Sequence, residues 1–127
     1  MKTQLEGLNQ ALKTKIEWIE CLVEQRKFAQ AFEEIKKVEN RKKIDEFSPE
    51  GKDLCYLSAV ALYRLGNYRE AKSKAESAYD FLKNTSENRK VAQIQDILGR
   101  AYLDLGDLKN AENYVRDAIT TYRRIGD

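Results

Sequence analysis

The chain has 127 residues, of which 42% are hydrophobic and 35% are charged, and it contains a single proline. This length fits one domain, and the composition is that of a helix-rich globular protein, which excludes a disordered chain. A net charge of +2 provides no general attraction to nucleic acid or to a membrane surface. No apolar stretch reaches the roughly 20 residues that a membrane span needs, and the N-terminal residues do not resemble a signal peptide. We therefore expect a cytoplasmic protein.

Apolar spacing and helix-capping residues predict six helices along the chain. In order, they cover residues 4–25, 28–43, 49–65, 68–83, 87–105 and 108–124. Residue types that cap or begin helices mark several of the N-termini. These residues are Thr3 with Glu6, Ser48 before Pro49, and Thr85 or Ser86.

Two glycines mark the turns between paired helices. Gly66 and Gly106 are predicted to end the third and fifth helices, because the left-handed conformation after a helix favours glycine. Asn67 and Asp107 come next and can cap the following helices, and Asn67 with Glu70 resembles a capping box. Each pair of helices is therefore expected to form a tight hairpin.

The three hairpins repeat at an interval of 40 residues. The shift aligns apolar or small residues along both helices, with Arg26 as the exception: Ile19, Ala59 and Gly99; Arg26, Gly66 and Gly106; Phe28, Tyr68 and Leu108; Ala31, Ala71 and Ala111. Self-similarity at a fixed period is typical of a repeat solenoid. We expect an all-α fold of three antiparallel hairpins, over about residues 4–43, 49–83 and 87–124, within one domain that spans residues 1–127.

The third hairpin, ILGRAYLDLGDLKNAENYVRDAI, resembles a tetratricopeptide repeat. The matching residues are Leu98, Gly99, Tyr102, Gly106, Ala111, Val115 and Ala118. The second hairpin keeps most of this pattern, whereas the first keeps Leu22, Phe28 and Ala31 and has Arg26 in place of glycine. The usual unit has about 34 residues, so a 40-residue unit implies longer helices. The resemblance implies a right-handed α-solenoid that acts as a protein-interaction scaffold.

Residues that carry catalytic or metal chemistry are scarce. The sequence contains no histidine, which is the commonest general base near neutral pH and the commonest transition-metal ligand. It has no Gly-rich phosphate-binding loop, no serine or cysteine with a base partner, and no metal-like spacing of Cys21 and Cys55. We therefore expect neither an enzyme nor a bound cofactor or metal.

The resemblance also implies a concave groove lined by the first helix of each hairpin. Acidic residues outnumber basic ones there, and the Lys/Asn clamp with which some family members hold a C-terminal carboxylate is missing. An amphipathic or basic peptide or helical segment is therefore the expected partner. Ordinary packing between hairpins remains the alternative for the tyrosines. The predicted groove residues are Glu17, Glu20, Glu24, Tyr56, Val60, Tyr63, Arg64, Asp96, Arg100 and Asp104.

Two other functions are alternatives to groove binding. The segment KKVENRKK at residues 36–43 contains five cations and could attract nucleic acid or an acidic partner. Cations near a helix C-terminus also complement the helix dipole, and no aromatic residue interleaves them, so nucleic acid is the less favoured partner. The other alternative is self-association as a homodimer across the last helix. Its uncovered residues are expected to be Ala118, Ile119, Tyr122 and Ile125. The simplest account of this uncovered face is that the chain is a fragment of a longer protein, which would expose the same residues.

Overall fold

The computed structural model describes residues 4–41 and 43–126. Within them the chain forms six α-helices and no strand. The bounds are α1 Gln4–Glu24, α2 Phe28–Arg41, α3 Pro49–Arg64, α4 Tyr68–Leu82, α5 Asn88–Asp104 and α6 Leu108–Ile125. Each bound lies within two residues of the one predicted from the sequence.

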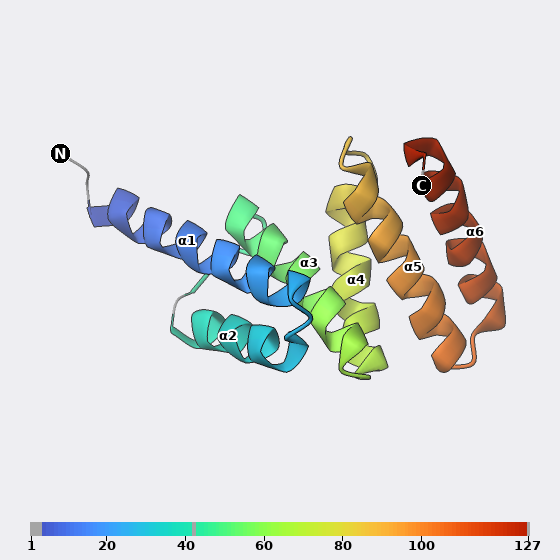
Figure 1. Cartoon of the computed structure of the whole chain (residues 1–127), viewed down its shortest axis with the longest axis horizontal. Helices are drawn as coiled ribbons and strands as arrows, with labels where there is room; N and C mark the ends of the chain where they lie inside the picture. The colour runs from blue at the N-terminus through green and yellow to red at the C-terminus, as the bar shows by residue number, and fades with distance from the viewer. Residues whose placement is uncertain (1–3, 42, 127) are drawn as a thin grey trace.

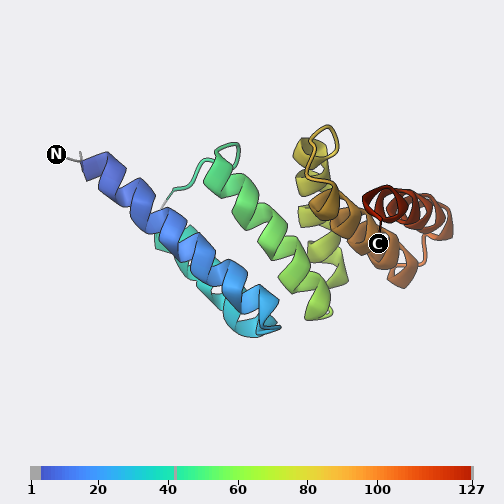
Figure 2. The same ribbon diagram turned by 45° about the horizontal axis from the view of Figure 1, so that its top comes forward.

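The helices form three antiparallel hairpins that follow one another in chain order. Figures 1 and 2 show α1 and α2 at one end of the molecule and α5 and α6 at the other. Helix α3 packs against both helices of the first hairpin, and α5 packs against both helices of the second. Each first helix thus covers the hairpin before it, which confirms the predicted all-α solenoid.

The three hairpin turns share one backbone conformation. Gly66 and Gly106 have φ angles of 84° and 86°, which confirms the left-handed turns predicted from the sequence. Arg26, at the equivalent position, has a φ of 62° and is the one non-glycine residue with a positive φ among the described residues. In each turn the N–H group of the next residue donates to the carbonyl five residues back, at 2.8–3.0 Å.

The predicted helix caps are only partly formed. The Ser48 side chain accepts from Gly51 N before Pro49, and the Asp107 side chain accepts from Asn110 N, as expected. The prediction for Asn67 was wrong, because its side chain makes no capping hydrogen bond. The prediction that Thr85 or Ser86 caps α5 was wrong, because the N-cap is Glu87 and its side chain makes no capping bond. Thr85 Oγ1 donates to Leu82 O in the preceding turn. The Thr3–Glu6 cap and Lys42 lie outside the residues that can be described.

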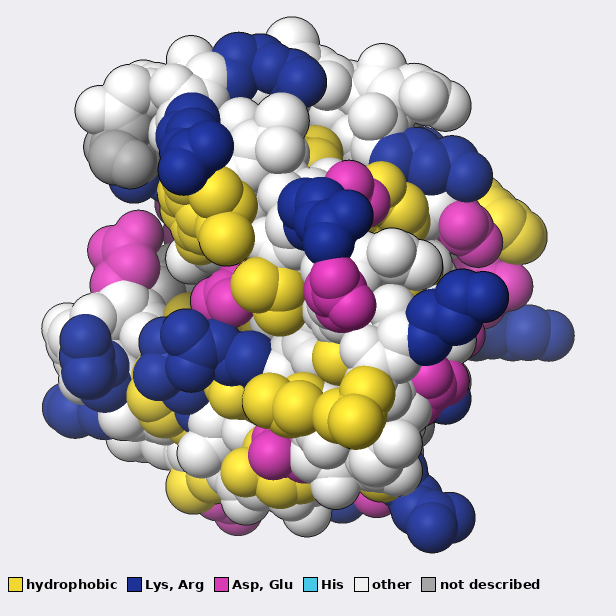
Figure 3. All heavy atoms as spheres, turned by 90° about the vertical axis from the view of Figure 1, so that its right-hand side faces the viewer, with side chains coloured by type: hydrophobic (Ala, Val, Ile, Leu, Met, Phe, Trp, Pro, Cys, Tyr) yellow, Lys and Arg dark blue, Asp and Glu magenta, His cyan; other side chains and the backbone are white. Residues whose placement is uncertain are grey.

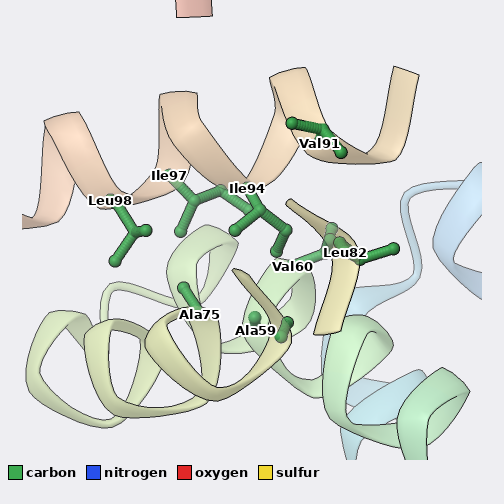
Figure 4. Close-up of a cluster of buried hydrophobic side chains, with 9 residues drawn as sticks. Ala59, Val60, Ala75, Leu82, Val91, Ile94, Ile97 and Leu98 are labelled. Carbon is green, nitrogen blue, oxygen red and sulfur yellow. The ribbon is translucent and has the colours of Figure 1, made fainter. Parts of the chain in front are cut away.

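Two hydrophobic clusters hold the hairpins together. One cluster joins the first hairpin to α3 and contains Ile19 and Ile35. The other joins the second hairpin to α5, and Figure 4 shows Ala59 and Ala75 beneath Ile94 and Leu98. Nearly all of this surface is removed from water, which is the main favourable term in folding.

The two helices of each hairpin meet at a pair of residues whose size differs between the hairpins. The pair is Ile19 and Ile35 in the first hairpin and Ala59 and Ala75 in the second. The third has Gly99, where an added Cβ would lie 2.6 Å from Val115 Cγ2. Backbones of α5 and α6 accordingly run close together over more of their length than those of α1 and α2.

Candidate functional site

The three first helices form one layer, with α3 between α1 and α5. Most of the predicted groove residues lie at least partly on the surface of this layer. Glu17, Glu24, Arg64, Arg100 and Asp104 are exposed. Glu20, Tyr56, Tyr63 and Asp96 are half-buried.

The centre of this layer is a cluster of polar side chains from all three helices, which we call the groove cluster: Glu20, Asp53, Tyr56, Lys90 and Gln93. The Tyr56 hydroxyl donates to Gln93 Oε1, and Lys90 Nζ lies 5.3 Å from the centre of the Tyr56 ring. Lys90 Nζ is also 4.0 Å from Asp53 Oδ1. Residues from α3 and α5 are therefore held in contact at this point.

Lys90 was missed by the sequence analysis. The residues implied by family resemblance began further along α5, whereas Lys90 lies in its first turn. Its Nζ lies 3.8 Å from Glu87 Oε1, one turn back, as well as near Asp53 on α3. The only sequence signal was a basic residue at helical spacing from Glu87, which is common on exposed helix surfaces.

Burial and neighbouring negative charges disfavour ionisation of the carboxyl groups in the groove cluster. Desolvation raises the pKa of Glu20, Asp53 adds to the rise, and Lys90 opposes it. Desolvation also raises the pKa of Asp53, with Lys90 opposing and Glu87 and Glu50 adding to it. Tyr56 has a pKa raised to about 12, mainly by burial. The single lysine thus offsets the acidic surroundings only in part.

The other half of the layer is built differently. The Tyr63 ring lies 5.6 Å from that of Tyr68 on α4, so this tyrosine also packs within its own hairpin. Arg100 Nε is 3.0 Å from Asp96 Oδ1, one turn back on α5. The Arg64 guanidinium lies 5.8 Å from the centre of the Phe28 ring and therefore reaches toward the first hairpin turn. Arg100 and Asp96 thus form an ion pair within α5, whereas Arg64 lies against an aromatic ring.

Two residues do not occupy the surfaces predicted for them. Val60 is only 9% exposed and belongs to the hydrophobic cluster between the second and third hairpins, so it is not available to a partner. Ala118 is 4% exposed and is buried rather than uncovered at the end of the solenoid. The other residues of that predicted face remain accessible, since Ile119 is exposed and Tyr122 and Ile125 are half-buried.

The basic segment at residues 36–43 is partly neutralised by its surroundings. Lys37 Nζ lies 3.4 Å from Glu34 Oε1, and Lys15 Nζ on α1 lies 2.5 Å from the other oxygen of Glu34. Lys36 Nζ is 4.9 Å from the centre of the Phe32 ring. Glu34 therefore offsets part of the positive charge at the start of this segment.

A separate pocket of about 760 Å³ lies beside α2, α3 and α4. Its apolar lining includes Phe47, Cys55 and Phe81, and the Cys55 thiol donates to Lys74 O at 3.3 Å. Burial raises the pKa of this thiol, so it is not an activated nucleophile. Within the described part of the chain, no group of three His, Cys, Asp or Glu residues could hold a metal ion, and no helix could span a membrane.

Comparison with known proteins identifies the repeat. A family model described as tetratricopeptide repeat matches residues 54–124, which is more than half of the chain. The crystal structure of the tetratricopeptide domain of Arabidopsis FLU superposes with a TM-score of 0.70 at 23% identity, covering 94% of this chain and 98% of that one. At this identity the likeness shows the fold alone. None of the curated proteins matches the sequence. The chain belongs to the tetratricopeptide repeat family.

Proposed function

We propose that this chain is a non-catalytic scaffold that binds a basic or amphipathic helical segment over α1, α3 and α5. Tetratricopeptide repeats are generally protein–protein interaction modules. The observation that carries the proposal is the groove cluster, in which Glu20 and Asp53 from neighbouring helices are partly desolvated beside Tyr56. A lysine or arginine of the partner would relieve the repulsion between these carboxylates.

The tyrosine determines where the apolar side of the partner would lie. Tyr56 is fixed by its hydrogen bond to Gln93 and by Lys90 above its ring. A half-buried aromatic ring that is already held in place loses little side-chain entropy on binding, which is why tyrosines are frequent at binding hot spots. We therefore place an aliphatic side chain of the partner against Tyr56 and its cation against Glu20.

Two synthetic peptides test the charge preference. One is an amphipathic helix with leucines on one face and lysines on the other, and the second has every lysine replaced by glutamate. Fluorescence anisotropy with the lysine peptide should show binding to the unmodified chain. Glu20→Lys or Tyr56→Ala should each weaken it about tenfold, a loss of roughly 1.4 kcal/mol. Preference for the glutamate peptide would contradict the proposal.

A control variant on another surface completes the test. Lys43→Ala changes a residue in the α2–α3 loop, outside the groove cluster, and should leave the affinity unchanged within about twofold. A stronger effect of Lys43→Ala than of Glu20→Lys would move the binding site to the surface formed by the second helices. That result would favour an acidic partner or nucleic acid instead.

Acidification should weaken binding of the lysine peptide. Because the pKa values of Glu20 and Asp53 are raised, these carboxyls gain protons at a higher pH than ordinary surface carboxyls do. Their negative charge, and with it the attraction for lysine, is lost as the pH falls from neutral. The charged groups around them are Glu17, Glu24, Glu50, Glu87 and Lys90. A Glu20→Gln, Asp53→Asn double variant should bind weakly and lose most of this pH dependence.

A further inference from the structure

The C-terminal end of the solenoid carries exposed apolar side chains between charged ones. On α6, Ile119 is 46% exposed and Val115 is 37% exposed, and Leu103 near the end of α5 is 54% exposed. Figure 3 looks onto this end of the molecule and shows hydrophobic side chains interspersed with Lys, Arg, Asp and Glu. No helix in the described part of the chain covers this face.

The internal junction between the second and third hairpins shows what such a face accommodates. Ala75 and Leu82 on α4 are buried beneath α5, and Tyr79 packs against the third hairpin with its ring 5.9 Å from that of Tyr114. A shift of 40 residues converts Ala75, Tyr79 and Leu82 into Val115, Ile119 and Tyr122. The C-terminal face therefore has the residues of a junction that would receive another first helix.

The opposite end of the molecule presents the surface of a covering helix. Helix α5 covers the second hairpin with a buried face that includes Val91, Ile94, Leu98 and Ala101. A shift of 80 residues places Ala11, Thr14, Trp18 and Cys21 of α1 at these positions, and all four are exposed. Trp18, at the position of Leu98, is 46% exposed, whereas Ile16, Ile19 and Leu22 on the other side of α1 are buried.

Charges on the two ends are also complementary. In the internal junction, Val60 and Ile97 belong to the same buried cluster, seen together in Figure 4. The equivalent residues at the two ends are Arg100 on α5 and Glu17 on α1, both exposed. Where the internal junction has two apolar residues, Val60 and Ile97, the two ends of the molecule carry opposite charges, Arg100 and Glu17.

We propose that the partner of these faces is a second copy of this chain, bound head to tail. The Ala11–Trp18–Cys21 face of one copy packs over α5 and α6 of the next, as α5 packs over α3 and α4 within the chain. A two-fold contact between two copies of α6 would instead leave the exposed Trp18 face of α1 uncovered. Because the head-to-tail contact uses different surfaces on the two copies, it continues beyond a dimer.

Complementing variants test this geometry directly. Trp18→Glu disables only the α1 face, and Ile119→Glu disables only the α6 face. Light scattering and sedimentation velocity should show the mass of the unmodified chain rising with concentration beyond that of a dimer. Each variant alone should stay monomeric, whereas an equimolar mixture should form a one-to-one heterodimer that grows no further.

Two controls separate a lost contact from a lost fold. Phe47→Glu changes a residue that is 75% exposed on the α2–α3 loop, away from both ends, and should associate like the unmodified chain. Glu17→Arg and Arg100→Glu should each weaken association, and a mixture of these two variants should associate again in alternating order, because both kinds of contact between unlike copies pair opposite charges. Circular dichroism should show unchanged helical content in all of them.

Two results would overturn the proposal. One is an unmodified chain that stays monomeric at the highest attainable concentration. The other is a monomeric Ile119→Glu variant beside a Trp18→Glu variant that still dimerises, with no heterodimer in the mixture, which would establish a two-fold contact through α6.

Discussion

The α1–α2 and α5–α6 hairpins have the same turn but different interiors. Both turns place one residue in the left-handed conformation and close with the same backbone hydrogen bond, although the residue is Arg26 in one and Gly106 in the other. Where the helices meet, the first hairpin has Ile19 and Ile35, and the third has Gly99 and Val115. Only the second and third hairpins match the family model.

This difference shows which features a helix hairpin requires. The left-handed turn and the spacing of buried positions are common to both hairpins, so they define the topology. The size of the residues at the contact between the helices varies, and the α5 and α6 backbones are in closer contact than those of α1 and α2. The small residues that are typical of the family thus affect how closely two helices pack. The hairpin topology forms without them.

Ile19→Gly should have the largest effect, because it transfers the residue of the third hairpin into the first. Ile19 is fully buried, so its removal leaves a cavity between helices that Ile35 holds apart. Loss of a large aliphatic side chain costs about 2–5 kcal/mol and glycine in a helix adds about 1 kcal/mol, so we expect about 3–6 kcal/mol in total. Urea unfolding followed by circular dichroism measures this free energy.

Thr14→Gly provides the matched control, since Thr14 is exposed on the same helix. It should cost less than about 1 kcal/mol, the contribution of helix propensity alone. Equal losses in the two variants would mean that Ile19 does not hold the helices apart.

Gly99→Ala should destabilise the third hairpin by about 1–3 kcal/mol, because the added Cβ would lie 2.6 Å from Val115 Cγ2. Combining it with Val115→Ala recreates the Ala59–Ala75 pair of the second hairpin and should recover much of that loss. A double-mutant cycle measures the coupling, which we expect to exceed about 1 kcal/mol. Additive effects would show that Val115 is not the residue that limits the approach.

The turns should respond in opposite directions. Gly106→Ala should destabilise the protein by about 1 kcal/mol, because alanine is strained at a φ of 86°. Arg26→Gly should stabilise it by up to about 1 kcal/mol, since it relieves the same strain. Thermal unfolding of both variants tests the comparison. Gly7→Ala is the control, because Gly7 lies within α1 with open space around its Cβ position, and alanine there should stabilise.

Tyr102→Phe should have the smallest effect at neutral pH, about 0.5 kcal/mol. The Tyr102 hydroxyl donates to Glu76 Oε1 at 2.8 Å, whereas the first hairpin has Leu22 at this position and no such bond. This bond to Glu76, aided by burial, raises the pKa of Tyr102 from 10.0 to about 12.

The raised pKa makes the hydrogen bond visible in alkaline titration. Below pH 10 the tyrosine is neutral in both folded and unfolded chains, so its contribution does not vary. As the pH rises from 10 toward 12, the unfolded chain ionises first, and stability falls. Ultraviolet titration should show one late-ionising tyrosine fewer in Tyr102→Phe. An unchanged titration curve would contradict this assignment.

Most of the fold could be predicted from the sequence because its signals are local. Helix periodicity, the left-handed glycines at 66 and 106 and the Ser48 cap act within a few residues of one another, and all were confirmed. Asn67 was predicted as a cap by residue type alone. Its side chain makes no capping bond, whereas Asp107, at the equivalent position and with the same turn hydrogen bond, accepts from Asn110 N, so residue type does not decide which of the two caps its helix.

The candidate site could be predicted less well because it depends on contacts between helices. Glu20 and Tyr56 were identified, but their proximity to Lys90 arises from the way α1, α3 and α5 pack together. Val60 and Ala118 were assigned to surfaces although neighbouring helices bury them. The periodicity of one helix shows which of its faces makes contacts. It does not show whether another helix of the same chain or a separate molecule covers that face.

The unequal residue pairs inside the hairpins also protect the chain from a hazard of repetitive sequences, which is pairing of the wrong repeats during folding. If α4 paired with α5 in the manner of α6, Ala75 would face Gly99 and leave a void. If α6 paired with α3, Val115 would crowd Ala59, where Ala75 normally fits. Although the helices are similar, they cannot replace one another. Each correct pairing packs better than a pairing between the wrong repeats.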